Sequence, residues 1–239
     1  MHRRSLITVL ENVLTRPHAD IALHEPCISE IDKNYVMSCL ESTFVSSVGA
    51  YVDRLENQLG DYLGVKKVVA VVNGTAALHV ALSAIDIKEG DEVLTPALCF
   101  VGTANAISHA SAVPHFVDSC PITMGISPVA LKEYLSYVAE PALGGFRNRF
   151  TGRRLAALIP VHVFGHPCEM LELLEIAQKY KLSVVEDAAE SLGSFYLGKH
   201  TGTFGKIGIF VSTVIKLSLL EAVEPFALMT KHLGLKLNI

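Results

Sequence analysis

Apolar residues follow two different patterns along the chain. In the first 66 residues they recur with helical spacing: Ile31, Tyr35 and Met37 predict a helix over 28–41, and a second helix is expected over 50–63. From residue 67 onward, short apolar runs alternate with longer amphipathic segments. The runs predict strands at 67–72, 91–96, 112–118, 155–165, 182–187 and 205–210, with helices between them.

The alternation of strands and helices indicates an α/β fold, in which helices cover both faces of a mostly parallel sheet. Residues 140–153 carry glycines and arginines and are expected to form a loop or an excursion from the sheet. In such folds, ligands bind beyond the carboxyl ends of the strands. The residues near the ends of the predicted strands include Gly74 and the polar side chains of Asn73, Thr75, Thr95, Asp118, His162 and Asp187.

Composition narrows the classes of function. The chain has 239 residues, 50% of them apolar, so it can bury a sizeable core. Its net charge is −4 and it carries no basic run, which argues against a nucleic-acid partner. Five widely spaced cysteines indicate neither a disulfide framework nor a metal site, and they suit a reducing cytoplasm. Interrupted apolar runs predict neither a signal peptide nor a membrane span.

The segment Asn73-Gly74-Thr75 stands between a predicted strand and a predicted helix. Exposed N–H groups and the helix dipole make such a junction an anion site, so a phosphate group fits there. The same pattern also suits an ordinary turn with a helix N-cap. The residues alone leave both interpretations open.

Two carboxylates, Glu186 and Asp187, end the predicted strand at 182–187. A carboxylate at the carboxyl edge of the sheet can pair with the protonated ring nitrogen of pyridoxal phosphate (PLP). It can equally cap a helix or bind a metal ion. The pattern alone does not decide among these roles.

Several segments together resemble a known family. NGTAALHVAL, GDEVLTPALCFVGTANAI, PVHVFGHP and VVEDAAESLGS resemble the DegT/DnrJ/EryC1/StrS family of PLP-dependent sugar aminotransferases, in order, between Ile21 and Phe210. The resemblance is greatest to the branch that aminates nucleotide-linked 4-keto-6-deoxy sugars, of the legionaminic-acid and bacillosamine type. It implies a large domain of the aspartate-aminotransferase type (fold type I), followed in the family by a smaller C-terminal domain that this chain is expected to lack.

The resemblance also implies roles for individual residues. Thr75 and Ala76, in the turn that begins at Gly74, would bind the PLP phosphate. Phe100 would stack on the pyridine ring, Asp187 would pair with the ring nitrogen, and Glu190 would lie near the ring hydroxyl. By contrast, His162 and His166 are expected to be satisfied structural residues rather than members of the site.

After Phe210 the family pattern breaks. The resemblance leads us to expect a string such as SFNGNKIITTGGGGA, but the chain reads VSTVIKLSLLEAVEP from Val211. Codons can be chosen that encode residues 211–225 in the given frame and that, when the first two bases are skipped, encode FNGNKIITTGGGGA in the new frame. We therefore expect a reading-frame shift caused by one lost base. Lys216 would stand at the Schiff-base position with its neighbours changed, and Val211 would replace a phosphate-binding serine.

Three segments are therefore expected: an N-terminal helical segment at 1–66, an incomplete PLP-binding large domain at 67–210, and a frame-shifted tail at 211–239. The implied activity is transfer of an amino group, with glutamate as donor, to a nucleotide-linked keto sugar for polysaccharide or nonulosonic-acid synthesis. The intact family would form homodimers. Because of the altered tail, we expect this chain to be inactive; the alternatives are a catalytically dead remnant or a binding module that retains the fold.

Overall fold

The computed structural model describes residues 28–45 and 49–211, together with the backbone of 216–220. Residue contacts divide the chain into two units, Met1–Ser46 and Ser47–Ile239. The helices of the second unit are α3 (Ala50–Leu63), α4 (Gly74–Ala84), α5 (Val101–His109), α6 (Pro128–Val138) and α7 (Met170–Tyr180), with a 3-10 turn η1 (Val163–Gly165). Its strands are β1 (Lys67–Ala70), β2 (Glu92–Pro96), β3 (Val113–Val117), β4 (Ala139–Ala142), β5 (Gly145–Asn148), β6 (Arg154–Leu158), β7 (Ser183–Asp187), β8 (Phe195–Tyr196), β9 (Lys199–His200), β10 (Ile207–Val211) and β11 (Lys216–Leu220).

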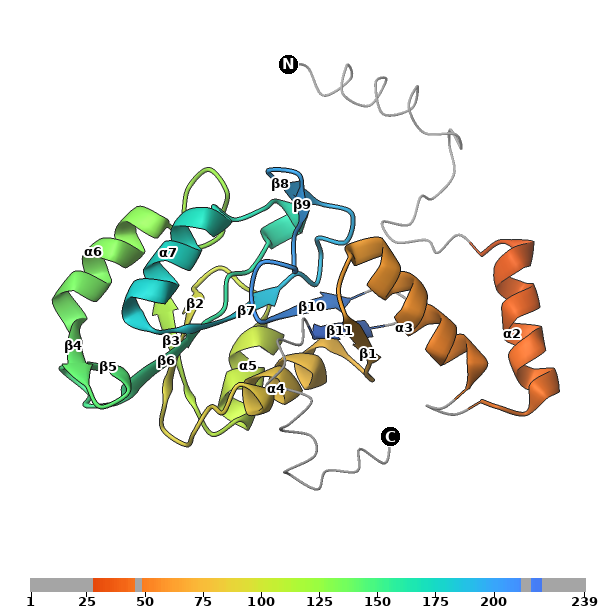
Figure 1. The fold of residues 1–239 in the computed structure, drawn as a ribbon, viewed down its shortest axis with the longest axis horizontal. Helices are drawn as coiled ribbons and strands as arrows, with labels where there is room; N and C mark the ends of the chain where they lie inside the picture. The colour runs from red at the N-terminus through yellow and green to blue at the C-terminus, as the bar shows by residue number, and fades with distance from the viewer. Residues whose placement is uncertain (1–27, 46–48, 212–215, 221–239) are drawn as a thin grey trace, which may run out of the picture. The chain divides into compact units, whose positions relative to one another are not determined.

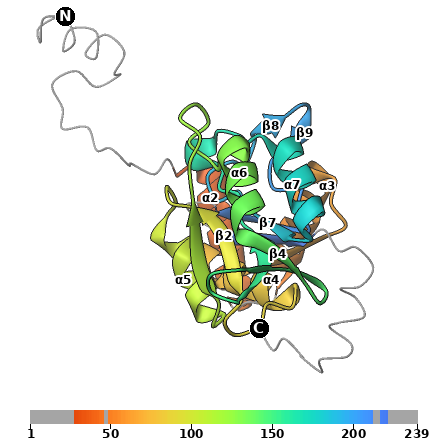
Figure 2. The same cartoon turned by 90° about the vertical axis from the view of Figure 1, so that its left-hand side faces the viewer.

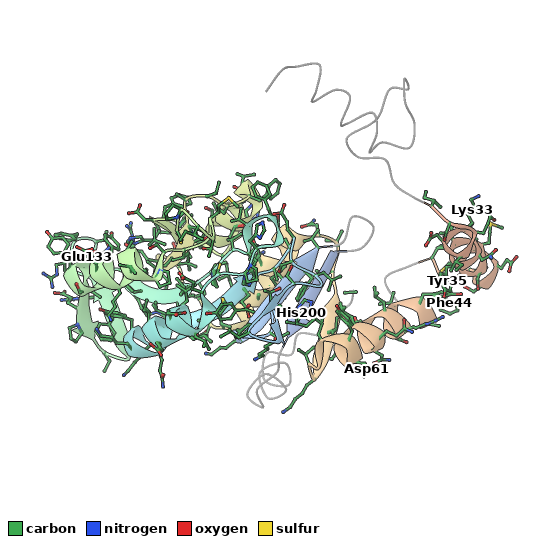
Figure 3. All side chains as sticks on the ribbon, turned by 90° about the horizontal axis from the view of Figure 1, so that it is seen from above. Lys33, Tyr35, Phe44, Asp61, Glu133 and His200 are labelled. Atoms are coloured by element: carbon green, nitrogen blue, oxygen red, sulfur yellow. The ribbon has the colours of Figure 1, made fainter. Side chains whose placement is uncertain are left out.

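In the first unit, the structure describes one helix, α2 (Glu30–Ser42). A capping box begins it: the Asp32 N–H donates to the Ser29 side chain, and the Ser29 N–H donates to Asp32 Oδ2 at 2.7 Å. The helix ends at Thr43 in the left-handed conformation. None of its side chains is buried, and the exposed rings of Tyr35 and Phe44 are seen in Figure 3.

The central sheet has the strand order β1-β11-β10-β7-β6-β2-β3, with the β4–β5 hairpin attached to β6. Neighbouring strands from β10 to β3 run parallel, as predicted. Strand β11 is antiparallel to both β10 and β1. The carboxyl ends of β10, β7, β6 and β2 therefore lie along one edge, where parallel sheets place their ligands.

Helices cover both faces of this sheet, as Figure 1 shows for α4 and α5 on one side and α6 and α7 on the other; Figure 2 gives the view after a quarter turn. One core cluster joins α6 and α7 to the sheet and includes Leu131, Leu158 and Leu173. A second cluster joins α4 and α5 to the opposite face through residues such as Leu82 and Ile107. Burial of these apolar faces provides the main stabilisation of the fold.

Two sequence expectations need correction. Within the range predicted as a strand, 155–165, the continuous strand β6 ends at Leu158; beyond Pro160, which has no N–H to donate, pairing resumes only as an isolated bridge between Val161 and Asp187 before the chain turns into η1. Residues 140–153, expected as a loop or excursion, contain most of the β4–β5 hairpin. In addition, helix α3 packs with β1 through Leu59, Leu63 and Val68, so it groups with the sheet rather than with the preceding helix.

We also find that, within the described part of the chain, no helix combines the length and apolar character needed to cross a membrane.

Candidate functional site

A pocket of about 430 Å³ lies at the carboxyl edge of the sheet. Its lining comes from segments that follow β1, β2, β6 and β7, and from the end of β10. Gly74 and Asp187 both line it, which agrees with the expectation that these two strand ends face one cavity. Residues Thr75, Phe100 and Glu190, also predicted from the sequence, line the same pocket.

The first turn of α4 provides one end of the pocket. Asn73 is the N-cap, and its Oδ1 accepts the Ala76 N–H at 2.8 Å. Gly74 and Thr75 line the pocket, whereas Ala76 does not. N–H groups in a first helical turn have no partner within the helix, and the dipole makes this end partially positive. This end of the pocket can therefore bind an anion, while the Ala76 N–H is already bonded to the N-cap.

The two adjacent carboxylates at the end of β7 lie in different environments, because successive side chains of a strand point to opposite faces of the sheet. Asp187 lines the pocket and is only 5% exposed. Its Oδ2 accepts the Thr103 hydroxyl at 2.6 Å, and its Oδ1 accepts the Ala189 N–H at 3.3 Å. Burial raises the pKa of the Asp187 carboxyl above its ordinary value, and the two hydrogen bonds only partly offset this rise.

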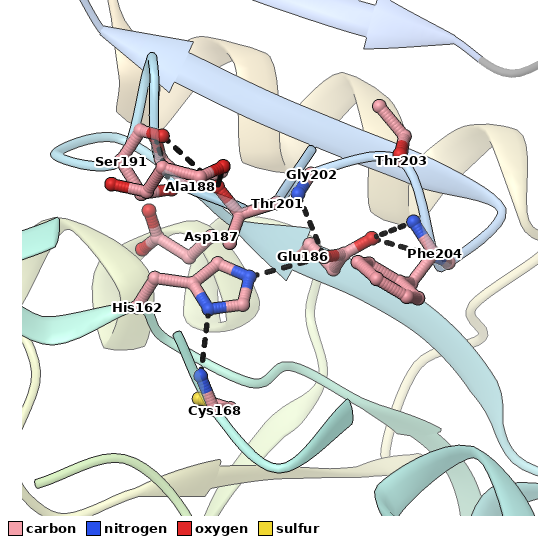
Figure 4. Close-up of polar contacts among 12 residues, drawn as sticks. His162, Cys168, Glu186, Asp187, Ala188, Ser191, Thr201, Gly202, Thr203 and Phe204 are labelled. Atoms are coloured by element: carbon pink, nitrogen blue, oxygen red, sulfur yellow. Dashed lines mark hydrogen bonds and ion pairs between the residues drawn. The ribbon is translucent and has the colours of Figure 1, made fainter. Parts of the chain in front are cut away.

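Glu186 is fully buried and belongs to the scaffold (Figure 4). Its Oε1 accepts the N–H groups of Phe204 and Gly205, both at 2.6 Å. Its Oε2 accepts the Gly202 N–H at 2.8 Å and lies 3.0 Å from His162 Nε2. Glu186 thus holds the 201–205 loop against β7. This role is none of the three that the sequence left open, which were pairing with a ring nitrogen, capping a helix and binding a metal ion.

His162 is satisfied on both ring nitrogens, as the sequence led us to expect. Its Nδ1 accepts the Cys168 N–H at 3.1 Å, so the proton must lie on Nε2, which donates to Glu186. Although His162 lines the pocket, neither nitrogen is available to a ligand. His166 does not line the pocket.

The segment that leads into α5 provides one side of the pocket. Phe100 is the N-cap residue of α5, lines the pocket, and is 76% exposed. Gly102 is required beside it, because a Cβ there would lie 2.7 Å from Thr75 Oγ1 and 2.9 Å from the Phe100 ring. This first turn of α5 therefore packs closely against the first turn of α4.

Glu190 supports another part of the pocket wall. Its Oε2 accepts the Phe164 N–H at 2.8 Å. Phe164 has a left-handed backbone (φ 52°) within η1, and its ring is 71% exposed beside the pocket. Non-glycine residues rarely adopt this conformation, so Glu190 helps to hold a strained turn.

Val211 stands where β10 leaves the pocket. A Cβ placed on Gly74 would lie 2.6 Å from Val211 Cγ2, so the valine side chain abuts the first turn of α4. The backbone of Lys216 pairs with Val211 in the β10–β11 ladder. The Lys216 side chain, residues 212–215 and residues 221–239 lie outside the described part of the structure, so the expected role of Lys216 stays a prediction.

Thr103 and Cys99 line the pocket but were not predicted. Their signal lay within the GDEVLTPALCFVGTANAI segment, which indicated Phe100 alone. Burial, followed by the charge of Asp187, raises the pKa of Cys99, so its thiol stays neutral at physiological pH. Thr103 belongs to the site because it touches Asp187.

Comparisons with known proteins agree with this geometry. The profile of the DegT/DnrJ/EryC1/StrS aminotransferase family matches residues 26–215. GDP-perosamine synthase of Escherichia coli O157:H7 is 38% identical over 190 residues, which cover 80% of this chain and 48% of that protein. The solved structure of an aminotransferase from Psychrobacter cryohalolentis has a TM-score of 0.72 at 26% identity, covering 84% of this chain and 49% of that one.

The structure of NtdA from Bacillus subtilis with bound cofactor PMP has a TM-score of 0.68 at 26% identity, covering 84% of this chain and 44% of that one. This chain thus spans about half the length of the proteins it matches. The solved structures share its fold, which confirms the predicted fold class: the large domain of fold-type-I PLP-dependent aminotransferases.

Proposed function

The chain belongs to the DegT/DnrJ/EryC1/StrS aminotransferase family, and we propose on this basis that it is the cofactor-binding part of a PLP-dependent sugar aminotransferase. One observation carries the proposal: a single pocket joins the N-terminus of α4 to the buried carboxylate of Asp187. A helix N-terminus binds anions, and a buried carboxylate binds cations. PLP carries a phosphate arm and a protonatable ring nitrogen at two separate positions of a flat ring.

The residues present fit this cofactor. Asp187 is a desolvated carboxylate facing the pocket, a costly arrangement unless a cationic partner occupies the site. The pocket between the two polar ends is mostly apolar, with the exposed ring of Phe100 on one side, which suits a planar aromatic ligand.

We assign the following roles to this chain's residues. Gly74 and Thr75 bind the phosphate, and Ala76 adds its N–H if it exchanges Asn73 Oδ1 for a phosphate oxygen. Phe100 stacks on the ring, and Asp187 holds the proton of the ring nitrogen. Glu190 lies near the ring hydroxyl, and Lys216 supplies the amine that holds the cofactor and moves a proton. When bound, PLP supplies an electron sink for bond cleavage at the carbon that bears the amino group.

The substrate we propose is a nucleotide-linked 4-keto-6-deoxy sugar, with glutamate as the amino donor, in the synthesis of cell-surface polysaccharides or nonulosonic acids. The name of the E. coli relative, which refers to a sugar linked to GDP, supports this class. We propose the cytoplasm as the location, because five widely spaced cysteines suit a reducing compartment. We expect the intact protein of this kind to act as a homodimer.

For the 239-residue chain itself we propose weak PLP binding and no turnover. Val211 offers no hydroxyl where the family pattern has a phosphate-binding serine, and the glycine-rich string expected after Lys216 is absent. The family profile also stops matching at residue 215, one residue before this lysine. Two of the expected anchors, Thr75 and Asp187, are still present in the pocket.

The test is titration of the purified full chain with PLP, followed by absorbance and by mass spectrometry after borohydride reduction. We expect saturable, weak binding, with covalent PLP on Lys216 that is lost in Lys216→Ala. No transamination should follow when glutamate and a nucleotide-linked 4-keto-6-deoxy sugar are added. Absence of saturable PLP binding would refute the proposed site, and Lys216-dependent turnover would refute the proposed inactivity.

A serine at position 211 should improve anion binding. Because Val211 abuts Gly74 in the pocket, the hydroxyl of Val211→Ser would reach the same end as the α4 N-terminus. A hydrogen bond to a charged group stabilises a complex by about 1.5–3 kcal/mol, so we expect a roughly tenfold or greater gain in affinity for PLP and for inorganic phosphate. Val211→Ala is the matched control, because it removes bulk without adding a donor. Equal gains in both variants would show that space, rather than the hydroxyl, limits binding.

The proposed frame shift predicts the nucleotide sequence of the gene. One base inserted directly after the Phe210 codon should restore an open frame that encodes SFNGNK and then a glycine run, and that continues past codon 239. Sequencing the locus across codons 205–239 tests this. A stop codon or an unrelated string in the restored frame would contradict the frame-shift explanation and leave 211–239 as an authentic segment.

A further inference from the structure

We propose that Thr103 is a positioning residue for Asp187: its hydroxyl fixes one carboxylate oxygen and favours the charged form, leaving the other oxygen to accept a hydrogen bond from the protonated ring nitrogen of the cofactor. This inference rests on the proposed function of the pocket. Thr103 lines that pocket from α5, whereas Asp187 ends β7, 84 positions later in the sequence.

The Thr103 hydroxyl contacts two side chains, the Asp187 carboxylate and the neutral Cys99 thiol, and the carboxylate is the stronger acceptor. Its Oγ1 lies 2.6 Å from Asp187 Oδ2, and both residues are buried, at 1% and 5% exposure. A hydroxyl has one proton, and an ionised carboxylate can only accept, so Thr103 must be the donor when Asp187 is charged. Among the described residues, the Asp187 Oδ1 receives only the longer bond from the Ala189 N–H, at 3.3 Å, and it keeps capacity for a ligand.

The Thr103 side chain is held in place by its helix turn. The Thr103 N–H donates to the Phe100 carbonyl at 3.0 Å, and Gly102 packs so closely on Thr75 that a Cβ would not fit. One turn of α5 thus contacts the residues proposed for the phosphate, the ring face and the ring nitrogen. Because the Thr103 backbone is held in this way, its hydroxyl can fix the orientation of the Asp187 carboxylate.

The charges around Asp187 show what the hydroxyl must overcome. Burial disfavours its ionised form, and the negative charge of Glu190, in the segment after β7, acts in the same direction. His162, after β6, also lines the pocket, with its Nδ1 accepting the Cys168 N–H, and Cys99, before α5, is a neutral thiol in the same pocket. Among the contributions that favour the charge, the Thr103 hydrogen bond is the largest. Without it, Asp187 would protonate more readily and could no longer pair with a ring N–H⁺.

The experiment compares three variants of the full chain: Thr103→Val, Thr103→Ser and Thr203→Val. Thr203 is the matched control, because it is also buried and donates at 2.6 Å, but to the His200 carbonyl and outside the pocket lining. PLP affinity is measured as a function of pH. We expect Thr103→Val to weaken binding about tenfold or more and to move the acidic loss of affinity to higher pH, while Thr103→Ser restores both.

A purely structural role would weaken binding without moving the pH of that loss, and this result would overturn the proposal. A second readout separates it from the proposed function: ¹³C NMR of labelled aspartate carboxyls, with Asp187→Asn for assignment, follows Asp187 in the chain without PLP. If the wild-type chain binds no PLP, the proposed function fails, whereas the Thr103 inference still predicts a higher Asp187 pKa in Thr103→Val alone. An Asp187 titration unchanged in Thr103→Val would overturn the inference even where PLP binds.

Discussion

Substitution of Glu186 by glutamine is expected to lower the free energy of unfolding by about 3–5 kcal/mol, the largest stability loss we anticipate for any single conservative change in this chain. Glu186 receives two backbone N–H groups on one oxygen, and a backbone N–H and the His162 ring on the other. A glutamine must present its NH₂ group to one of these pairs, whichever way it is oriented. Two buried donors then face another donor and lose their partner.

Chemical unfolding of the purified chain measures this effect. The matched control is Glu190→Gln, because Glu190 receives a single backbone N–H, from Phe164, among the described contacts and is less buried. We expect the control to lose no more than about 1 kcal/mol. If Glu186→Gln also lowers the free energy of unfolding by no more than about 1 kcal/mol, the 201–205 loop does not depend on the Glu186 carboxylate.

The 201–205 loop also shows why this role could not be predicted from the sequence. It packs so closely that a Cβ on Gly208 would lie 1.9 Å from the Gly202 carbonyl oxygen, and one on Gly205 would lie 2.7 Å from the Val184 carbonyl oxygen. The glycines are visible in the sequence, but the partners that require them lie on other segments. Periodicity locates elements along the chain; it does not show which loops close on a given carboxylate.

The strands and helices themselves were largely predictable, because their apolar periods are regular. Val68 and Val69 lie in β1, within the short β-branched run that predicts this strand. The strand predicted over 155–165 is too long, because apolar and β-branched residues continue past Pro160, whose missing N–H interrupts the ladder and leaves only an isolated bridge at Val161. Local propensity thus predicts a longer strand than the backbone hydrogen bonds form.

Some residues of the candidate site could be predicted from the sequence and others could not. Gly74 and Asp187 were predictable because the carboxyl ends of parallel strands meet at one edge. Thr103 was not, because it lies inside a helix, where a threonine offers no pattern that distinguishes a carboxylate partner from solvent. Ala76 was expected to bind phosphate, but its N–H is bonded to the Asn73 side chain; the contacts show the N-cap, and the phosphate site in this turn stays a prediction.

Replacement of Asp187 by asparagine should have opposite effects on stability and on cofactor binding. Because burial raises the pKa of the folded-state carboxyl above its ordinary value of 3.8, the folded chain holds a proton more tightly than the unfolded chain. The wild-type free energy of unfolding therefore falls as pH rises through the interval between the two pKa values, and stays lower at neutral pH. Asp187→Asn removes this loss, so without PLP the variant should be more stable than wild type at neutral pH, by on the order of 1 kcal/mol. At pH values below both pKa values, the two proteins should have nearly the same free energy of unfolding.

Unfolding across a pH series, with and without PLP, tests both effects. The neutral amide in Asp187→Asn cannot hold a ring N–H⁺ as a carboxylate does, so we expect PLP affinity to fall at least about tenfold and PLP to stabilise only the wild type. Asp91→Asn is the matched control: Asp91 is also 5% exposed, but Arg154 Nε lies 2.9 Å from its Oδ1. Removing that paired charge should destabilise the chain. If Asp187→Asn also destabilises at neutral pH, contacts within the chain already offset the cost of burying the carboxylate, and Asp187 does not require a cationic ligand.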